Sequence, residues 1–291
     1  MRTKRLDVAV LNITTHPHTP TQYIELFRRA KQERVVGLAH GDRHAIISSF
    51  SKAVGEDVEL WTGHLNSFVD FDPKAPWLNV ERGEVAEPSE VAAVQLPEDL
   101  KPAMKQAFFA FAPKSHRFVF ELTSGMGVQS VCRALRLILN SPKVRGELPE
   151  VTVNIEQERD TLERIFGMQV LRHLRIMVNR PNPDDFGSED AEVEQRLERQ
   201  RARKLTMTLD SEKNQGLTPD DDTKKLARLA MSNGRVHAEG VGKMGTTERI
   251  STENHPLIQT TLYNPNTTFK DQAFVRAVKE VIASVVARIG K

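Results

Sequence analysis

The sequence has little that would suit an exported or membrane-bound protein. It contains one cysteine, Cys132, so no internal disulfide bond can form, which is typical of a reducing compartment. The longest apolar runs, such as Val281 to Ala287, are too short and too interrupted to span a bilayer. The basic N-terminus leads to Asp7 and Asn12 instead of to the apolar core of a secretion signal. We therefore expect a cytoplasmic protein that makes no membrane contact.

Catalytic motifs are also missing. Ser48, Ser49 and Ser51 fall in an expected strand, and the Gly-x-Ser-x-Gly turn of serine hydrolases is absent. The one glycine-rich turn between a strand and a helix, at residues 124–127, lacks the lysine of a phosphate-binding loop and the third glycine of a dinucleotide site. We therefore favour a protein that is not an enzyme and needs no cofactor.

Charge is nearly balanced over the whole chain but unevenly distributed along it. The totals are 41 Lys and Arg residues against 39 Asp and Glu residues. Residues 50–122 carry 7 basic and 12 acidic side chains, whereas residues 196–243 carry 11 basic and 7 acidic ones. An acidic N-terminal part followed by a basic C-terminal part favours a polyanionic partner for the latter.

Hydrophobic periodicity predicts an α+β fold with mixed sheets packed against helices. Val8, Val10 and Ile13 supply apolar β-formers to a strand expected over Asp7–Thr14, and apolar and polar residues alternate over Val151–Ile155. A C-terminal amphipathic helix is expected over Thr268–Ile289, with an apolar stripe that must pack on a sheet or across a dimer. We expect two lobes, an N-terminal α+β lobe at residues 1–145 and a C-terminal α+β lobe with a basic surface at residues 146–291.

Local signals predict further elements that bear on function. A basic helix is expected over Glu192–Lys204, and a second one begins with Thr218 as the cap and a proline at the first helical position. A short strand is expected over Arg117–Leu122. The Pro-, Glu- and Gly-rich segment Asp72–Lys101 predicts a long surface connection.

The two basic helices carry the strongest functional signal. Acidic residues become rare toward the end of the first helix, so its arginines have few partners there. No Phe, Tyr or Trp lies between Phe186 and Tyr263, which favours phosphate contacts along a duplex over stacking on single-stranded bases. A solvated helix face is the alternative interpretation. The residues predicted to bind nucleic acid are Arg196, Arg199, Arg201, Arg203, Lys204, Lys224, Lys225 and Arg228.

Two clusters raise the alternative of a metal-dependent nuclease. His40, Asp42 and His44 would share one face of an extended segment, but a zinc site needs three or four converging ligands. A polar turn before a strand explains these residues better, because no second ligand pair of recognised spacing is present. The acidic run 220–222 is explained by its place in the first turn of a helix, where the helix dipole favours negative charge.

A third cluster invites an acid–base interpretation. His116, Arg117 and Glu121 lie at the two ends of one expected strand and could serve proton transfer. We favour a solvent-exposed face of an edge strand, because no nucleophile lies nearby in the sequence.

Turn and strand motifs identify a family more clearly than an activity. They include Trp61-Thr62-Gly63, Arg180-Pro181-Asn182-Pro183-Asp184-Asp185 and Asn233-Gly234-Arg235-Val236. Others are Trp77-Leu78-Asn79, Lys114-Ser115-His116-Arg117-Phe118, Gly240, Ser251-Thr252 and Pro256. On these residues the chain resembles, over nearly its whole length, the bacterial family known as domain of unknown function 4747.

More remotely, the part after about Val151 resembles the phage exclusion proteins of the lambdoid RexA type. The shared pattern is a proline turn, a helix rich in acids and Lys/Arg, a glycine-bearing strand pair and a final amphipathic helix. This resemblance implies sequence-nonspecific binding to DNA, as a homodimer, in antiviral defence. Two alternatives stay open: a metal-dependent nuclease, or an interaction module that senses a phage component or a second defence protein.

Overall fold

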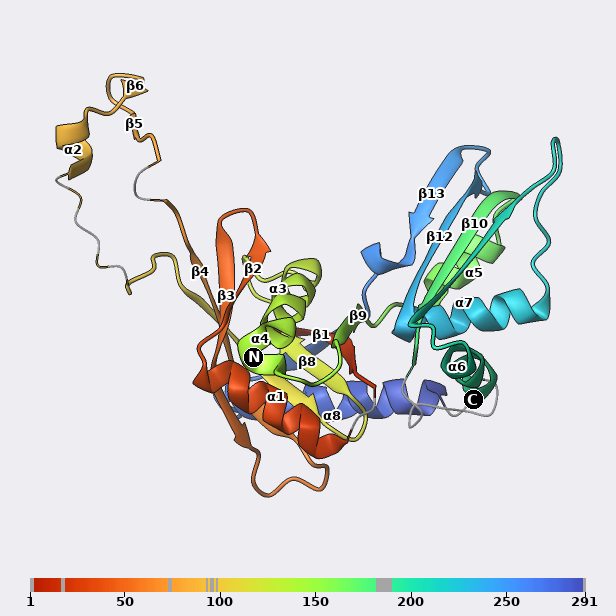
Figure 1. Cartoon of the computed structure of the whole chain (residues 1–291), viewed down its shortest axis with the longest axis horizontal. Helices are drawn as coiled ribbons and strands as arrows, with labels where there is room; N and C mark the ends of the chain where they lie inside the picture. The colour runs from red at the N-terminus through yellow and green to blue at the C-terminus, as the bar shows by residue number, and fades with distance from the viewer. Residues whose placement is uncertain are drawn as a thin grey trace.

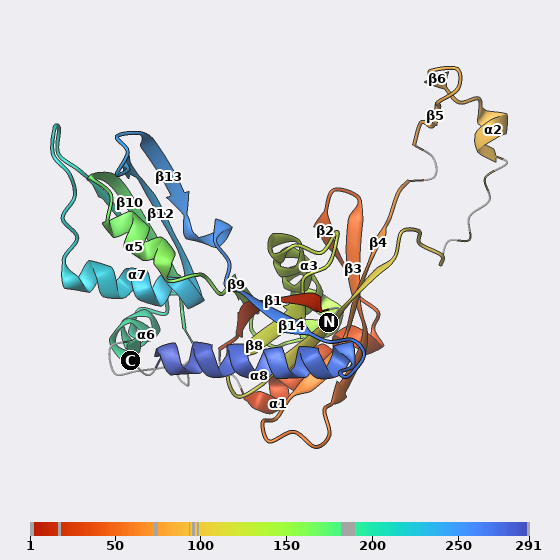
Figure 2. The same cartoon turned by 180° about the vertical axis from the view of Figure 1, so that it is seen from behind.

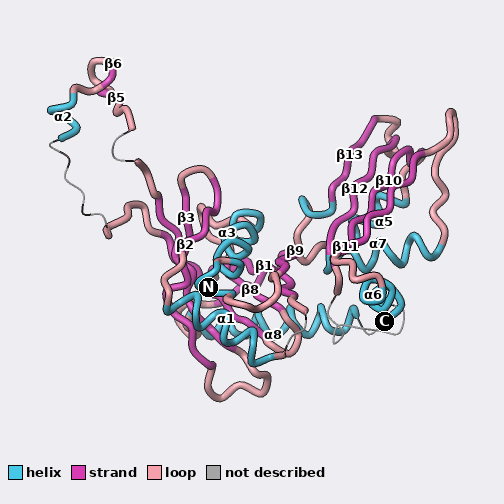
Figure 3. The backbone as a smooth tube through the Cα atoms, viewed as in Figure 1, coloured by secondary structure: helices cyan, strands magenta, loops and turns pink. Residues whose placement is uncertain are grey.

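The computed structural model describes residues 3–16, 19–72, 75–92, 94, 97, 99–181 and 190–289. Its strands form two main sheets with helices packed against them, and a small separate hairpin (Figures 1 and 3). The predicted α+β class is confirmed. The sequence had predicted sheets of mixed strand direction, but every strand pair described is antiparallel.

The first sheet has the strand order β14-β1-β8-β7-β4-β3-β2, and β9 also pairs with β1. The bounds of these strands are β1 (Lys4–Thr14), β2 (Val36–His40), β3 (Arg43–Lys52), β4 (Trp61–Val69), β7 (Lys105–Ala112), β8 (Arg117–Glu121), β9 (Thr152–Ile155) and β14 (Ile258–Tyr263).

Helices cover both faces of this sheet. On one face lie α1 (Pro20–Gln32), α3 (Val128–Asn140) and α4 (Pro142–Arg145), packed against a core that includes Leu11. On the other lies α8 (Lys270–Ile289), packed against a core that includes Val10, the preceding residue of the same strand. Figure 2 shows α8 lying across the sheet on the side away from α3. Because successive side chains of a strand point to opposite faces of the sheet, the same strands contribute to two hydrophobic cores.

The predicted apolar stripe of the C-terminal helix is buried, as expected, and it packs on a sheet. Its buried members are Phe274, Val278, Val281, Ile282 and Val285. At the start of this helix, Lys270 Nζ lies 2.5 Å from Glu121 Oε1 and so ties the helix to β8.

The described residues of the predicted long surface connection are largely exposed and extend away from both sheets as an arm (Figure 1). It contains β5 (Leu78–Asn79), β6 (Glu84–Val85) and α2 (Pro88–Ala92). Arg82 holds this arm together through two hydrogen bonds, of 3.0 and 2.7 Å, to the two carboxylate oxygens of Glu90.

The second sheet has the order β11-β10-β12-β13. Its strands are β10 (Val170–Asn179), β11 (Lys204–Asp210), β12 (Gly234–Val241) and β13 (Thr247–Ser251), and its helices are α5 (Asp160–Phe166), α6 (Asp190–Arg199) and α7 (Asp221–Asn233). Residues of α5 and α7 share one hydrophobic core with one face of the sheet. The other face carries polar side chains such as Arg175 and Thr208, which are exposed.

In the sequence, the second sheet is inserted between two strands of the first sheet, β9 and β14. Strand β9 pairs with the C-terminal half of β1 and is followed by the second sheet. A single 3₁₀ turn (Thr252–Asn254) then leads to β14, which pairs with the N-terminal half of β1. Residues from both sides of the expected boundary at 145/146 thus build the first sheet.

Two predicted helix bounds are wrong. The first basic helix ends at Arg199, because Arg201 adopts a left-handed conformation (φ 51°) and the N–H of Ala202 donates to Leu197 O at 2.8 Å. Arg201 and Arg203 therefore lie in a turn, and Lys204 begins a strand. Helix α7 is capped by Asp220, whose carboxylate accepts from Thr223 N at 2.8 Å, and not by Thr218.

The edge-strand interpretation of Arg117–Leu122 is also wrong. Strand β8 lies between β1 and β7, and His116, Arg117 and Glu121 are all buried. No helix within the described part of the chain is long and apolar enough to cross a membrane.

Candidate nucleic-acid interface

A groove lies where β9 of the first sheet meets the ends of β10, β11 and β12 of the second. Its narrower part has a volume of about 290 Å³ and is lined by residues from α3, β9 and the 3₁₀ turn as well as from the second sheet. It continues along the turn between α6 and β11 into a wider part, and both parts are lined by Glu150, Arg203 and Lys204. Segments that are distant in sequence therefore share one surface.

Cations outnumber carboxylates in this groove. Among the described residues that line it are Arg136, Arg180, Arg201, Arg203, Lys204 and Arg235, against the carboxylates of Glu150, Glu198 and Glu253. The formal charge of the lining is therefore positive, which attracts phosphates and releases their counterions.

Part of this positive charge is neutralised within the groove. Arg203 Nη2 lies 2.7 Å from Glu150 Oε2, Arg235 Nη1 lies 3.0 Å from Glu253 Oε2, and Arg180 Nη2 lies 2.9 Å from Glu198 Oε1. The hydrogen bond from Arg203 holds the pKa of the Glu150 carboxyl below its ordinary value, so this carboxylate is ionised at neutral pH.

Three cations of the groove keep their charge available. No described carboxylate lies within ion-pairing distance of Arg136, Arg201 or Lys204. Arg136 is positioned by a hydrogen bond of 2.9 Å from Nη2 to the carbonyl of Val153 in β9. The left-handed backbone at Arg201 turns this residue out of α6 at the wider part of the groove.

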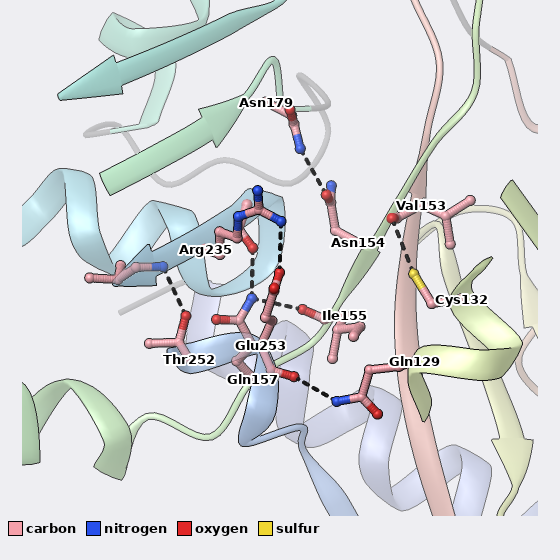
Figure 4. Close-up of polar contacts among 12 residues, drawn as sticks. Gln129, Cys132, Val153, Asn154, Ile155, Gln157, Asn179, Arg235, Thr252 and Glu253 are labelled. Carbon is pink, nitrogen blue, oxygen red and sulfur yellow. Dashed lines mark hydrogen bonds and ion pairs between the residues drawn. The ribbon is translucent and has the colours of Figure 1, made fainter. Parts of the chain in front are cut away.

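Neutral hydrogen bonds hold the two walls of the groove together (Figure 4). Asn179 Nδ2 at the end of β10 donates to Asn154 Oδ1 in β9 at 2.8 Å. Gln157 Nε2 donates to the carbonyls of Ile155 and Gly234, at 3.1 and 2.7 Å. Gln129 of α3 donates to Glu253 O at 3.2 Å. The cations on both walls therefore belong to elements that are connected to each other by hydrogen bonds.

The polar face of the second sheet extends this surface. Arg175 of β10 is exposed and stands opposite Thr208 of β11 and His237 of β12. Burial lowers the pKa of His237, and the nearby charge of Arg235 lowers it further, so this imidazole is neutral at pH 7. Strands β10 to β13 contain no Phe, Tyr or Trp, so this face offers no aromatic platform for bases.

The structure brings only three of the eight residues predicted from the sequence into the groove. Arg201, Arg203 and Lys204 line the groove. Arg196 and Lys225 instead share a second pocket, between α6 and α7, with three carboxylates: those of Glu192, Asp220 and Asp222. Lys224 Nζ lies 3.9 Å from Asp221 Oδ1, while Arg199 and Arg228 are exposed outside the groove.

Three groove cations were missed by sequence reasoning. The sequence pattern connected none of Arg136, Arg180 and Arg235 with the basic segment. A groove built by segments on two sheets leaves no spacing pattern in the sequence. The turn motif Arg180-Pro181 and the strand start Gly234-Arg235 were visible signals, but only of local structure.

The His40, Asp42 and His44 segment is a turn and not one extended strand. β2 ends at His40, Gly41 is left-handed (φ 51°), and β3 begins at Arg43. His44 Nδ1 lies 3.3 Å from the carbonyl of Asp42, and the ring stacks on Phe68. Within the described ranges, no three His, Cys, Asp or Glu side chains are grouped as a metal site requires.

The His116, Arg117 and Glu121 set is divided among buried contacts. Arg117 Nη1 donates to Asn12 Oδ1 and to Ser115 O, each at 2.8 Å, while Glu121 pairs with Lys270 at the start of α8. Arg117 Nε also lies 3.7 Å from Glu156 Oε2. These contacts join β8 to β1, to the residue that follows β9 and to the start of α8.

The chain is similar over residues 4–279 to the model of the family described as Domain of unknown function (DUF4747). The match spans nearly the whole sequence, so the protein is a member of this family, as its turn and strand motifs predicted. A search of curated proteins gave no match.

Proposed function

We propose that this protein binds double-stranded DNA, without sequence preference, through the groove between its two sheets. The observation that carries the proposal is the excess of cations over carboxylates among the described residues of the groove, including three arginine and lysine side chains with no described carboxylate partner. Phosphate oxygens are the natural partners of such side chains in nucleic acid complexes.

The chemistry of the surface favours a duplex and argues against base reading. Stacking on single-stranded bases needs aromatic side chains, and the strands of the second sheet have none. Arg175 is exposed on β10 of this sheet and offers a cationic contact beyond the groove. Contacts of this kind fix position on a duplex and carry no sequence information.

The biological role that we propose is bacterial antiviral defence. It rests on the remote resemblance to lambdoid phage exclusion proteins, which also implies a homodimer in the cytoplasm and leaves room for a second defence protein as a partner. Sequence-nonspecific DNA binding suits such a role because invading DNA presents no fixed sequence.

The test is a gel-shift series over salt concentration with duplex DNA, single-stranded DNA and RNA. We expect the duplex to bind best, unrelated duplexes to bind alike, and the logarithm of affinity to fall with log salt at about −0.9 per phosphate contacted. Arg201→Glu combined with Arg203→Glu should weaken binding to every duplex and flatten this slope. The melting temperature should stay nearly unchanged, because both side chains are exposed.

The matched control is Arg133→Glu combined with Arg276→Glu. Both residues are exposed on helices outside the groove, and this pair changes the net charge by the same amount. A control that weakens binding equally would show that only overall charge matters. A parent protein that binds no nucleic acid at low salt would overturn the proposal and favour the interaction module, whereas metal-dependent cleavage of the DNA would favour the nuclease.

A further inference from the structure

Strand β14 is one edge of the first sheet, and its outer side is open. It pairs with β1 in an unbroken register from Lys4↔Tyr263 to Ala9↔Ile258. The carbonyl of Asp7 accepts from Leu122 N at 2.9 Å, so this residue directs its backbone groups toward β8. Because directions alternate along an antiparallel strand, Leu6 and Val8 bond to β14 at Thr261 and Gln259.

The same alternation fixes which groups of β14 point outward. They are the N–H and C=O groups of Ile258, Thr260 and Leu262. Among the described residues, these backbone groups have no hydrogen-bond partner. Their side chains share one face of the sheet, opposite α8, and those of Ile258 and Leu262 are apolar and exposed to 39% and 62%.

Within the described part of the chain, this edge has none of the usual protection against pairing with another strand. Soluble proteins protect edges with charges, prolines, bulges or covering elements. The sequence Ile-Gln-Thr-Thr-Leu-Tyr of β14 has no charge and no proline, and its pairing shows no register shift. The opposite edge, β2, is protected: its register shifts between Leu38 and His40, and Gly37 lies so close to α3 that a Cβ there would come within 2.4 Å of Ala134 O.

We propose that β14 is the dimer interface of this protein, pairing antiparallel with β14 of a second copy. A twofold axis at Thr260 places this residue opposite its own copy and places Ile258 opposite Leu262 of the partner. All three outward N–H groups and all three outward C=O groups then bond across the axis, because the three residues have the same orientation. The two exposed apolar side chains meet on one face, as cross-strand pairs do.

A second copy fits this edge better than an unrelated strand does. The outward residues occupy alternate positions symmetric about Thr260, so the edge is self-complementary, as a twofold interface requires. The hydroxyl of Thr260 is already directed inward, donating to Asp7 Oδ1 at 2.6 Å, so the centre carries no unpaired polar side chain. The proposal is independent of the proposed DNA binding, and its test uses no nucleic acid.

The first test is the mass of the full-length protein in solution by light scattering and sedimentation. We expect twice the chain mass of 32.8 kDa. Leu262→Lys should yield monomers by placing a charge on the edge, and Leu262→Pro should do so by removing an outward donor that β1 does not use. Leu137→Lys, at a leucine exposed to 47% on α3, is the matched control and should stay dimeric.

The second test reads the register by cross-linking. Facing residues in a hydrogen-bonded antiparallel pair are about 5.5 Å apart between Cα atoms, within the range of a disulfide. Thr260→Cys should therefore form a covalent dimer on oxidation, whereas Ile258→Cys should do so only when mixed with Leu262→Cys. The parent is the background control, because its one cysteine, Cys132, is buried.

Either of two results would overturn the proposal. One is a parent protein that stays monomeric at its highest soluble concentration. The other is a dimer that survives Leu262→Lys and Leu262→Pro and shows no cross-link at Thr260→Cys, which would place the interface elsewhere. Monomers of the two variants should keep the parent's far-ultraviolet circular dichroism, which separates loss of pairing from loss of folding.

Discussion

Arg203 Nη2 lies 2.7 Å from Glu150 Oε2, and this ion pair joins the turn before β11 to the segment before β9. Both side chains are substantially exposed, so the pair contributes at most about 1 kcal/mol to stability. Its larger effect is on the charge of the groove, because Glu150 neutralises one of the cations proposed to contact phosphate.

Glu150→Gln should therefore strengthen DNA binding. The change frees Arg203, so we expect several-fold higher affinity at low salt and a salt slope steeper by up to about 0.9. The melting temperature should change little. Glu147→Gln removes an equal charge from an exposed carboxylate outside the groove and is the control. Equal affinities for the two variants would mean that Arg203 does not face the DNA.

The arm provides a pH-dependent measurement. Two hydrogen bonds from Arg82 lower the pKa of Glu90 from 4.5 to about 2. Because the pKa is lowered in the folded arm, the contribution of this pair to local structure is complete above about 4.5 and is lost as the pH falls through about 2. NMR titration of the Glu90 carboxyl should show a midpoint near pH 2, and Arg82→Gln should move this midpoint back toward 4.5. Arg34→Gln, at a distant turn, should leave it in place.

Two valines of α8 offer a matched test of the packing on the first sheet. Val281 is fully buried and Val286 is 49% exposed on the same helix. Val281→Asp places a carboxylate in the apolar core and should cost more than about 4 kcal/mol or abolish soluble folding. Val286→Asp should cost less than about 1 kcal/mol. Urea unfolding monitored by circular dichroism measures both, and similar values would mean that the helix is not docked on the sheet.

The buried guanidinium of Arg117 should be a major determinant of stability. Arg117→Ala leaves Asn12 and Glu156 in the interior without it, and removing one partner of a buried ion pair typically costs about 3–5 kcal/mol. Arg133→Ala, at an exposed arginine of α3, should cost less than about 0.5 kcal/mol. The free energies of unfolding in urea distinguish these outcomes. A small effect at Arg117 would mean that water replaces its contacts.

We also expect the purified protein to contain no tightly bound transition metal. The ligand set at His40, Asp42 and His44 is incomplete, since the turn between β2 and β3 does not group these side chains, and no group of three such ligands exists among the described residues. Elemental analysis measures this directly. Stoichiometric zinc or manganese that is lost on changing both histidines to alanine would contradict the prediction and revive the nuclease alternative.

Much of the local structure could be predicted because it depends on short-range patterns. The strands β9 and β11 show clean alternation of apolar and polar residues, and the terminal helix shows a stripe at helical spacing. Strand β7 was not predicted, because the run Phe108 to Ala112 is apolar at every position and so shows no alternation of apolar and polar residues. Such a run occurs in strands covered on both faces, as this one is.

The burial of Arg117 and the composition of the groove could not be predicted for a different reason. Both depend on which distant segments meet: Arg117 contacts Asn12, which lies 105 positions away, and Arg235 faces the groove from a strand far beyond Arg136 in the chain. The end of α6 was missed because a left-handed arginine terminates it, where a glycine would have been the visible signal.

The pairing of β1 with β14 has a consequence for how the protein is made. Lys4 pairs with Tyr263, so β1 leaves the ribosome long before its partner β14, and the first sheet cannot close until β14 has been made. The intervening second sheet is built from consecutive segments and can form while synthesis continues. Until α8 has been made, the apolar face of the first sheet that it will cover stays exposed, which favours aggregation of the nascent chain.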